Sequence, residues 1–535
     1  MICLSQIEAS CYRGRANIFF CAADSSPRLQ KKKFARPLIK NMDLATIKKI
    51  HCVGIGGIGV SAIAKFFLSL GATVTGSDVS SSVITQDLEK RGVKIFYGHK
   101  AENVSNDVDL IIYSPAVPKD NPERQKGIQE LSYPEFLGEL SKQYFTIAIS
   151  GTHGKSTTTA LIGLILEAAG FDPLVIVGSR VPGWELGNIR LPASLRAPAP
   201  AYRQAGADKA GEAEAIPNNK KIFVVEACEH QANMLNLCPQ AVVITNIEPD
   251  HLDFYGNFDN VKSAFQKFVR LVPKNGLVIF NGDREAELDW NYARPSMWKL
   301  IWQVLFSRRV KWRSFGFKTP NDYQALDREV KNGNQFFNVQ SGLSKFHVKL
   351  SIPGKFNAYN ALAAMAVVLE LGAPVEVCQK VLANFKGIWR RFEILKEKPL
   401  IISDYGHHPT AIAETVKAAR EFYPGRRVVL VYQPHQHHRT KMLFNDFVSA
   451  LALPDVLILS DIYDVAGREE VTDQDVSSEK ILEAIKVSGG AGEYFYSGDL
   501  ATTERLAREI IKESDVILVM GAGDVDIIAR HLSIF

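Results

Sequence analysis

The sequence lacks any run of about 18 consecutive apolar residues, so no segment is long enough to span a membrane as a helix. It also lacks paired cysteines: its seven cysteines are scattered without a CxxC spacing, which disfavours both a zinc site and a disulfide framework. A formal net charge of +5 over 535 residues is too small to indicate nucleic-acid binding. We therefore expect a protein of the reducing cytoplasm, with neither stable membrane insertion nor a nucleic-acid partner.

The length of 535 residues is too great for one hydrophobic core and indicates about three domains. Three segments stand apart from the rest. Residues 1–41 are interpreted as a disordered extension, an upstream start codon before Met42, or a targeting peptide. Residues from about 190 to 220 are rich in Ala, Pro and Gly and predict an inserted mobile loop. An apolar run at 297–310 indicates a helix that packs on its own domain or lies on a membrane surface.

A strand-like run at 145–150 leads into a glycine-punctuated loop, and then Lys155 and four hydroxyl residues open a helix. Apolar residues recur at helical spacing before Gly170, at Leu161, Leu164, Ile165 and Ala168. Because a helix N-terminus favours phosphate, Lys155 is expected at the outer phosphates of a nucleoside triphosphate and Ser156 on Mg²⁺. A strict phosphate-loop pattern has glycine where this chain has Ile149, so a plain strand-turn-helix with a surface lysine is the alternative.

A second glycine-rich loop, GxGxxG at Gly54, Gly56 and Gly59, follows a strand-like run near the start of the chain. A helical pattern and another strand-like run then lead to Asp78. Glycines let the backbone approach a diphosphate and an acid suits a ribose hydroxyl, so the pattern favours a dinucleotide or nucleotide-sugar site. The alternative is a glycine-rich turn that only packs a helix on a sheet. A further buried strand within 109–117 also ends in a loop of the ligand-binding kind.

Two strands downstream of the phosphate loop each end in acidic residues. The strand at 222–225 ends in Glu226, and the next strand ends in the segment NIEPDHLD, which contains His251. Such strand ends bring ligands for Mg²⁺ beside a triphosphate, so Glu226 and His251 are predicted to have metal-related roles. The alternative is that Asp250 or Asp253 only caps the next helix.

Polar groups also gather further along the chain. Asn357 and Asn360 stand three residues apart before an Ala-rich helical pattern at 361–371, so they share a helix face and address one ligand, or act as caps. From about Phe385, strands alternate with helices and predict a second α/β sheet, with polar strand ends at 404–409 and 433–440. Eight of the twelve histidines fall in these polar loops without an HExxH spacing, which favours substrate contacts over a zinc site.

Eight motifs occur in one order: GIGGIG, GTHGKSTTT, the Glu226 strand end, NIEPDHLD, PGKFNAYN, WRRFE, DYGHHP and QPHxxxRT. Together they resemble the Mur ligases of peptidoglycan synthesis, over essentially the whole chain from Met42 apart from the inserted loop. The resemblance accounts for Ile149, because the phosphate loop of that family is itself a short GT(H/N)GK form. It implies an α/β fold of three domains: an N-terminal Rossmann-like domain for a UDP-sugar (42–144), a central P-loop ATPase domain (145–384) and a C-terminal Rossmann-like closing domain (385–535).

The resemblance also implies an activity. The family members with the most similar motifs use ATP and Mg²⁺ to form an amide bond between the lactyl carboxylate of UDP-N-acetylmuramate and L-alanine. ATP first phosphorylates the carboxylate, since oxide is a poor leaving group, and the amine then attacks the acyl phosphate. We expect a monomer or homodimer. The alternatives are a recycling ligase that adds a tripeptide to the same nucleotide sugar, a nucleotide-sugar-binding protein without activity, and the dehydrogenase that GxGxxG alone suggests.

Matched residue by residue, the resemblance implies five groups of site residues. Catalysis is assigned to Lys155, Glu226, His251 and Arg391. ATP binding is assigned to Gly151, Thr152, His153, Gly154, Lys155, Ser156, Thr157, Asn357, Asn360, Arg391 and Asp404. UDP-sugar binding is assigned to Gly54, Gly56, Gly57, Gly59, Asp78 and Ser114. The amino-acid and lactyl region is assigned to His407, His435 and Arg439, and Mg²⁺ to Ser156, Glu226 and His251.

Two departures from the family pattern bear on this assignment. The acidic EADE reads EACE, with Cys228 in place of Asp, and QPHRYSRT reads QPHQHHRT, with Gln436 in place of an arginine. Because arginine holds a carboxylate with two hydrogen bonds and glutamine cannot, the preference for alanine over glycine or serine is implied less strongly than the reaction. We hypothesise that His437 or His438 compensates. Unchanged alanine affinity after replacing both with alanine would contradict this hypothesis.

Overall fold

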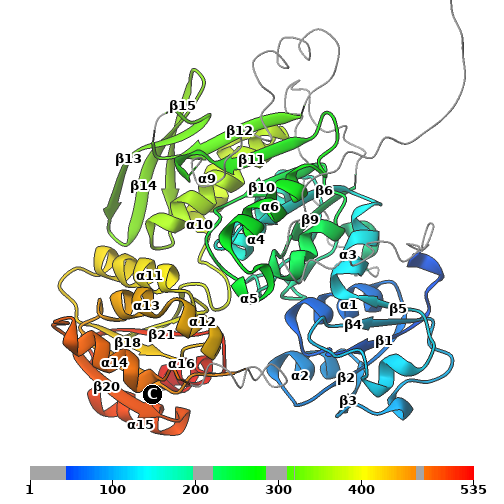
Figure 1. Cartoon of the computed structure of the whole chain (residues 1–535). Coiled ribbons are helices and arrows are strands. Elements are labelled where there is room, and N and C mark those ends of the chain that lie inside the picture. The colour runs from blue at the N-terminus through cyan, green and yellow to red at the C-terminus, as the bar shows by residue number, and fades with distance from the viewer. Residues whose placement is uncertain (1–43, 197–220, 285–309, 319, 465–474, 535) are drawn as a thin grey trace, which may run out of the picture. The chain divides into compact units, whose positions relative to one another are not determined.

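The computed structural model describes residues 44–196, 221–284, 310–318, 320–464 and 475–534. Residues 45–535 form one compact unit, whose described part contains three β-sheets (Figure 1). The predicted extension at 1–41, most of the predicted loop at 190–220 and nearly all of the apolar run at 297–310 lie outside the described residues. Within the described ranges, no helix is both long and apolar enough to cross a membrane.

The first sheet has five parallel strands in the order β3-β2-β1-β4-β5 (Figure 1). Its elements are β1 (Lys49–Val53), α1 (Ile58–Ser69), β2 (Thr73–Asp78), α2 (Val83–Lys90), β3 (Lys94–Tyr97), β4 (Leu110–Tyr113), β5 (Glu130–Ser132) and α3 (Tyr133–Ser141). The strand order reverses between β1 and β4, and open α/β sheets bind ligands at such a switch point, outside the carboxyl ends of the strands. Gly54 follows β1 and Ser114 follows β4, so both predicted UDP-sugar contacts stand there.

The second sheet has ten strands in the order β15-β14-β13-β12-β11-β10-β6-β9-β7-β8. Its strands are β6 (Phe145–Ser150), β7 (Leu174–Ile176), β8 (Ile189–Arg190), β9 (Ile222–Glu226), β10 (Ala241–Ile244), β11 (Leu277–Asn281), β12 (Lys311–Gly316), β13 (Tyr323–Lys331), β14 (Asn334–Ser341) and β15 (Ser344–Leu350). Its helices are α4 (Lys155–Ala168), α5 (Leu252–Tyr255), α6 (Phe258–Val269), α9 (Lys355–Glu370) and α10 (Val375–Asn384). Strand β6 runs parallel to both neighbours, β9 and β10, so the phosphate loop emerges beside the two acid-bearing strand ends.

Helix α4 packs against the sheet and against α9 and α10, inside the main core of this part of the chain (Figure 1). The predicted apolar stripe is only partly right. Leu161 and Ile165 are fully buried, but Ala168 is exposed and the hydroxyl residues at 156–159 are buried as well. Because neighbours cover the helix on several sides, its burial does not follow one stripe.

The third sheet has six strands in the order β16-β17-β21-β18-β19-β20, parallel except for β16. Its strands are β16 (Glu393–Glu397), β17 (Leu400–Asp404), β18 (Val428–Tyr432), β19 (Val456–Ser460), β20 (Glu493–Gly498) and β21 (Val516–Met520). Its helices are α11 (Pro409–Phe422), α12 (His437–Met442), α13 (Phe444–Leu451), α14 (Ser478–Val487), α15 (Leu500–Ile510) and α16 (Asp526–Ile534). The predicted α/β class with three domains is confirmed; the exact boundaries at 144/145 and 384/385 stay predictions.

A buried carboxylate, Glu123, ties the first sheet to the loop after β4. Glu123 is fully buried and accepts hydrogen bonds from the Ser77 hydroxyl and from Asn103 Nδ2, the latter at 2.6 Å. His99 Nδ1 lies 3.2 Å and His51 Nε2 3.8 Å from the same carboxylate. Burial by itself would raise the pKa of Glu123, but these partners outweigh burial and lower the pKa to about 2.

Replacing Glu123 with glutamine is expected to remove an acid-labile part of the stability of the first sheet. Because the folded-state pKa lies below the ordinary value of 4.5, the carboxylate stabilises the fold above that pH, and this contribution is lost as the pH falls toward 2. The shift corresponds to about 3 kcal/mol of opening free energy. Hydrogen exchange of peptides from β1 and β2 at about pH 7 and about pH 3 measures this opening free energy, and Glu102→Gln, at an exposed residue, is the control. Equal pH dependence in wild type and Glu123→Gln would contradict this role.

Candidate active site

A cavity of about 940 Å³ is lined by residues that follow strands of the second and third sheets. Its walls are the phosphate loop, the ends of β9 and β10, the start of α9, and the loops at 389–391, 404–411 and 435–439, and Ile58 of α1 and Ile84 of α2 also line it. Every residue predicted to bind ATP, Mg²⁺ or the amino acid lines this cavity, except Gly151. None of the six predicted UDP-sugar residues lines it. The structure therefore brings the ATP, metal and amino-acid groups together, and the nucleotide-sugar loop borders the same cavity through Ile58, which stands between Gly57 and Gly59.

The phosphate loop requires glycine at two positions. Gly151 and Gly154 have φ angles of 138° and 84°, which side chains disfavour. A Cβ atom on Gly154 would lie 2.2 Å from Asn360 Oδ1, and one on Gly151 would lie 2.0 Å from Thr245 Oγ1. Ile149, where a longer loop would have glycine, is instead a fully buried residue of β6. The loop is therefore short because the strand continues to Ser150.

Lys155 is the first residue of α4 and forms an ion pair with Glu229. Its Nζ lies 2.9 Å from the Glu229 carboxylate and donates to the carbonyl oxygens of Gly151 and Thr152. Burial by itself would lower the pKa of Lys155, but the adjacent Glu229 outweighs burial and raises it. The ammonium group is therefore charged, as a phosphate-binding lysine must be. Sequence reasoning gave Glu229 no role, although it is the last residue of the EACE motif.

Ser156 and Glu226, two of the three predicted Mg²⁺ ligands, are in contact. The Ser156 hydroxyl donates to Glu226 Oε2 at 3.2 Å, and the Gly178 N–H donates to Glu226 Oε1. Burial raises the pKa of Glu226, against the opposing effects of that N–H group and of the Lys155 and Arg391 charges. A hydroxyl and a carboxylate are oxygen donors of the kind that Mg²⁺ prefers, so this pair fits the ion.

His251, the third predicted ligand, faces other acids. Its Nε2 lies 3.9 Å from Glu229 Oε1 and 3.8 Å from Asp250 Oδ2. His251 itself is the N-cap of α5, with φ of 54° and no side-chain capping bond. The alternative in which Asp250 or Asp253 caps this helix is therefore wrong, and the His251 imidazole is left to face the cavity.

The asparagine pair lies inside a helix rather than at its cap. Helix α9 begins at Lys355, six residues before the predicted start, and Gly354 is its N-cap. The Asn360 amide donates to Asn357 Oδ1 at 3.1 Å, and Asn357 donates to the Pro353 carbonyl at 2.7 Å. This chain of bonds fixes Asn360 against the phosphate loop, where Thr158 Oγ1 lies 3.4 Å from its Oδ1.

Asp404 and Arg391 lie where two third-sheet loops meet. Asp404 is buried and accepts hydrogen bonds from the Phe392 N–H at 2.7 Å and the Gly406 N–H at 2.6 Å. Burial raises the pKa of Asp404, against the lowering effect of Arg391. The Arg391 guanidinium carbon lies 4.7 Å from the ring centre of Tyr405. Both side chains line the cavity, so their predicted ATP contacts stay predictions that the geometry permits.

Arg439, from α12, forms an ion pair with Asp250, from the loop after β10. The Arg439 Nη2 lies 3.1 Å and its Nε 3.3 Å from Asp250 Oδ1, and both side chains are at least nine-tenths buried. Burial would raise the pKa of Asp250, but Arg439 and His251 outweigh it, and the pKa lies well below its usual range. His435 Nδ1 lies 3.4 Å from Arg439 Nη1, and the His435 and His407 rings lie 5.8 Å apart. The three predicted amino-acid residues thus form one group, whose partner Asp250 sequence reasoning missed.

A smaller cavity of about 290 Å³ adjoins this group and shares Asp250, His251, Gln436 and Arg439 with the larger one. His437 and His438 line it, and His437 Nδ1 lies 2.6 Å from Asp464 Oδ2. The eight histidines that the sequence placed in polar loops all line one or both cavities, namely His153, His230, His251, His407, His408, His435, His437 and His438. Burial and the Arg439 charge lower the pKa of His407 well below its usual range, so its ring is neutral near pH 7.

The glycine-rich loop after β1 holds the predicted UDP-sugar residues. Asp78 Oδ2 accepts the Gly56 N–H at 2.8 Å, so this acid also fixes the loop. The Gly57 N–H donates to the Gly54 carbonyl at 3.1 Å. A Cβ atom on Gly59 would lie 2.6 Å from the Tyr133 ring, which is the packing role that the alternative interpretation assigns to a glycine here. Packing accounts for Gly59, whereas Gly54 stands at the switch point.

Cys228, where the family pattern has Asp, lines the large cavity and is exposed. The surrounding cavity wall, together with the Glu229 charge, raises the pKa of its thiol. The thiol therefore stays protonated and carries no charge near pH 7. Of the three acids in the family motif EADE, this chain keeps Glu226 and Glu229, and Glu229 pairs with Lys155.

Comparison with known proteins assigns the chain to a family along nearly its whole length. Residues 49–145 match the model "Mur ligase family, catalytic domain", 149–368 the "Mur ligase middle domain" and 390–523 the "Mur ligase, glutamate ligase domain". The chain is 36% identical over 501 residues to UDP-N-acetylmuramate--L-alanine ligase of Sulfurihydrogenibium sp., covering 91% of this chain and 98% of that protein. It is also 36% identical over 499 residues to the same-named ligase of Persephonella marina, covering 91% and 97%.

Solved structures agree with the sequence relatives. UDP-N-acetylmuramate-alanine ligase MurC from Thermotoga maritima is 28% identical and has a TM-score of 0.71, covering 90% of this chain and 97% of that one. A murein peptide ligase from Psychrobacter arcticus is 22% identical with a TM-score of 0.63, covering 91% and 98%, and shows the fold alone. The motif order, the three sheets, the phosphate loop with Lys155 and the family matches agree, and the chain belongs to the Mur ligase family.

Proposed function

We propose that this chain uses ATP to form the amide bond between the lactyl carboxylate of UDP-N-acetylmuramate and L-alanine, in cytoplasmic peptidoglycan synthesis. The observation that carries the proposal is that one cavity brings the phosphate loop with Lys155 together with the group of His407, His435 and Arg439. A nucleoside triphosphate, a carboxylate and a small amine substrate then meet in one place. The relatives at 36% identity that carry the name of this reaction supply the substrate identities.

The residues of the cavity supply what each step needs. Negative charge builds on phosphoryl oxygens when the carboxylate attacks ATP, and again when the amine expels phosphate. Lys155 and the N–H groups at the start of α4 stabilise that charge, with Arg391 as a further cation. Ser156 and Glu226, with His251 on the same cavity, would hold Mg²⁺, which would neutralise charge on the phosphates when bound. Closing the cavity keeps water away from the acyl phosphate.

Each of the three sheets belongs to a part of the chain that binds a different ligand. Residues 42–144 bind the UDP-sugar at the switch point, through Gly54, Gly56, Gly57, Asp78 and Ser114. Residues 145–384 bind ATP, and residues 385–535 supply Arg391, Asp404 and the amino-acid group. We propose a monomer or homodimer.

The direct test measures phosphate released from ATP in the presence of Mg²⁺, with and without UDP-N-acetylmuramate and with and without L-alanine. We expect release only when UDP-N-acetylmuramate and L-alanine are both present, and a product whose mass is the sum of the two minus water. Glycine and L-serine belong in the same series, because Gln436 stands where the family has arginine. Release with a tripeptide but with no single amino acid would show a recycling ligase instead. Binding of the UDP-sugar without any turnover would show a binding protein.

A further inference from the structure

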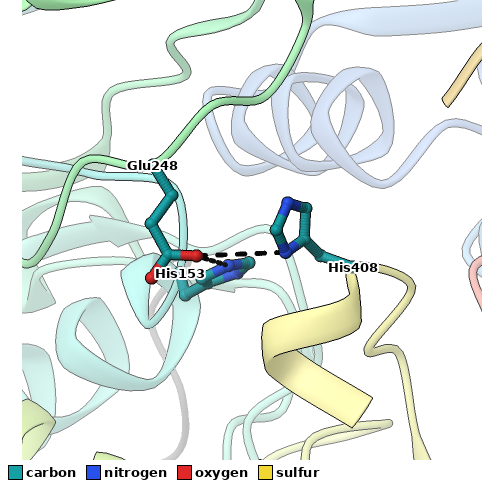
Figure 2. A group of neighbouring side chains, drawn as sticks. All are labelled: His153, Glu248 and His408. Carbon is teal, nitrogen blue, oxygen red and sulfur yellow. Dashed lines mark ion pairs between the residues drawn. The ribbon is translucent and has the colours of Figure 1, made fainter. Parts of the chain in front are cut away.

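His153, Glu248 and His408 converge from three separate segments of the chain, as Figure 2 shows. His153 belongs to the phosphate loop, Glu248 to the loop after β10, and His408 is the N-cap residue of α11. One ligand atom from each lies within 4.8 Å of the other two. His153 Nε2 lies 3.3 Å and His408 Nδ1 3.9 Å from the same carboxylate oxygen, Glu248 Oε2. No role proposed for this reaction uses Glu248 or His408.

We propose that these three side chains form a binding site for a divalent transition-metal ion of the zinc class, separate from the Mg²⁺ site. Two imidazoles and one carboxylate, with a fourth position open, are a donor set that Zn²⁺ and Co²⁺ take in tetrahedral geometry. Mg²⁺ prefers an octahedron of oxygen atoms and does not compete well for two imidazoles. The three residues all line the 940 Å³ cavity, so the fourth position faces it.

The distances suit such an ion after a small movement. Metal–ligand distances near 2.1 Å in a tetrahedron put neighbouring ligand atoms about 3.3 Å apart. The His153 and Glu248 atoms already have this separation, the His408 atom must move about 0.5 Å toward Glu248, and the two nitrogen atoms, which lie within 4.8 Å of each other, must approach as well. The ion would replace the hydrogen bond that His408 Nδ1 accepts from the Thr410 N–H at 3.3 Å.

Two observations favour a metal over a simple hydrogen-bonded cluster. The proposed ligand atom His153 Nε2 is buried and makes no hydrogen bond beyond its 3.3 Å approach to Glu248 Oε2, although buried polar atoms are usually satisfied. His408 as a whole is 94% buried, being 6% exposed. An ion at the cluster would satisfy His153 Nε2, and it would bind His408 through Nδ1, the nitrogen that faces Glu248.

The surroundings of the cluster resemble the outer shell of a metal site. Arg284 Nη1 pairs with Glu248 Oε1, and the Thr410 hydroxyl donates to Glu248 Oε2 at 2.8 Å, so the carboxylate is held in orientation. The backbone of His153 is held on both sides by Asn246, through its N–H at 2.9 Å and its carbonyl at 3.0 Å. Outer contacts of this kind fix the direction of metal ligands. A bound ion would connect the phosphate loop to the start of α11.

The test is a Co²⁺ titration of the chelator-treated full-length protein, in excess Mg²⁺ so that the Ser156 and Glu226 pair is occupied. Tetrahedral Co²⁺ absorbs strongly in the visible range, whereas octahedral Co²⁺ absorbs weakly. We expect the strong absorption to saturate at one equivalent of Co²⁺ and to disappear when Zn²⁺ is added. Glu248→Gln and His408→Ala should each weaken Co²⁺ binding at least about tenfold. His438→Ala, a histidine outside the cluster, is the matched control and should bind as wild type does.

X-ray absorption of the wild-type Co²⁺ complex is a second measurement that does not depend on variants folding, and should show two imidazole ligands. Weak octahedral absorption, equal binding by Glu248→Gln, or a spectrum without imidazole would each overturn the proposal. The titration uses no ATP and no nucleotide sugar. Phosphate release with Mg²⁺ alone therefore tests the ligase activity independently of this site.

Discussion

Replacing Lys155 with alanine is expected to lower kcat for phosphate release by at least about a thousandfold, while UDP-N-acetylmuramate still binds. Lys155 supplies a buried positive charge at the start of α4, where charge on the transferred phosphoryl group develops. Loss of one such group in a water-excluded site costs about 3–4 kcal/mol of transition-state stabilisation. The predicted nucleotide-sugar residues, such as Gly54, do not line the cavity that holds Lys155, so their binding should survive. Steady-state kinetics and titration calorimetry measure the two effects separately.

The control for this experiment must separate catalysis from folding. Lys155→Ala leaves Glu229 buried without its cation, and an unpaired buried charge costs about 3–5 kcal/mol of stability. A double variant, Lys155→Ala with Glu229→Gln, removes both charges and should restore the melting temperature without restoring turnover. Turnover of the Lys155→Ala variant within tenfold of wild type would refute the role given to this lysine.

Replacing Arg439 with alanine is expected to raise KM for L-alanine about a hundredfold and to change KM for ATP little. Arg439 lies beside His435 and lines both cavities, whereas the phosphate-loop residues line only the larger one. A guanidinium bound to a carboxylate contributes about 2–3 kcal/mol, which is the size of this effect. Arg439→Lys keeps the charge but not the paired geometry, so its KM for L-alanine should lie between those of the wild type and of Arg439→Ala. Steady-state kinetics with ATP and L-alanine varied in turn measure the two KM values separately.

Arg439 also holds Asp250, so its loss again needs a charge-matched control. Arg439→Ala together with Asp250→Asn removes both partners and should recover stability while the KM for L-alanine stays high. A parallel variant with His437→Ala and His438→Ala tests whether these histidines take over from the arginine that Gln436 replaces. If Arg439→Ala raised the KM for ATP as much as that for L-alanine, the side chain would act on the whole cavity and not on the amino acid.

Short motifs at strand ends made most of the cavity predictable. In a parallel sheet the carboxyl ends of neighbouring strands share one edge, so loops that follow such strands meet whatever their separation along the chain. Glu226 after β9, His251 after β10 and Lys155 after β6 follow this rule. The same rule places Asp404 and His435 together, after the third-sheet strands β17 and β18.

The sequence-based errors have a common cause. Helix α9 begins at Lys355 instead of Ala361, and α4 buries its hydroxyl residues together with its apolar ones. Local patterns describe one face of an isolated element, but packing against α9, α10 and the sheet decides which sides of α4 are covered. The three predicted metal residues line one cavity, where His251 contacts Glu229 and Asp250 while Ser156 contacts Glu226, and their role stays a prediction.

By itself the sequence determined the α/β class, the order of the elements and the residue types at each strand end, because these depend on periodicity and on motifs within a few residues. Only the tertiary structure decided which charges pair. Arg439 and Asp250 are 189 positions apart, and Lys155 and Glu229 are 74 apart. Such pairs depend on how the sheets and loops pack. Because both partners are removed from water, each pairing is strong and specific. For the same reason, the convergence of His153, Glu248 and His408 was visible only after the chain had folded.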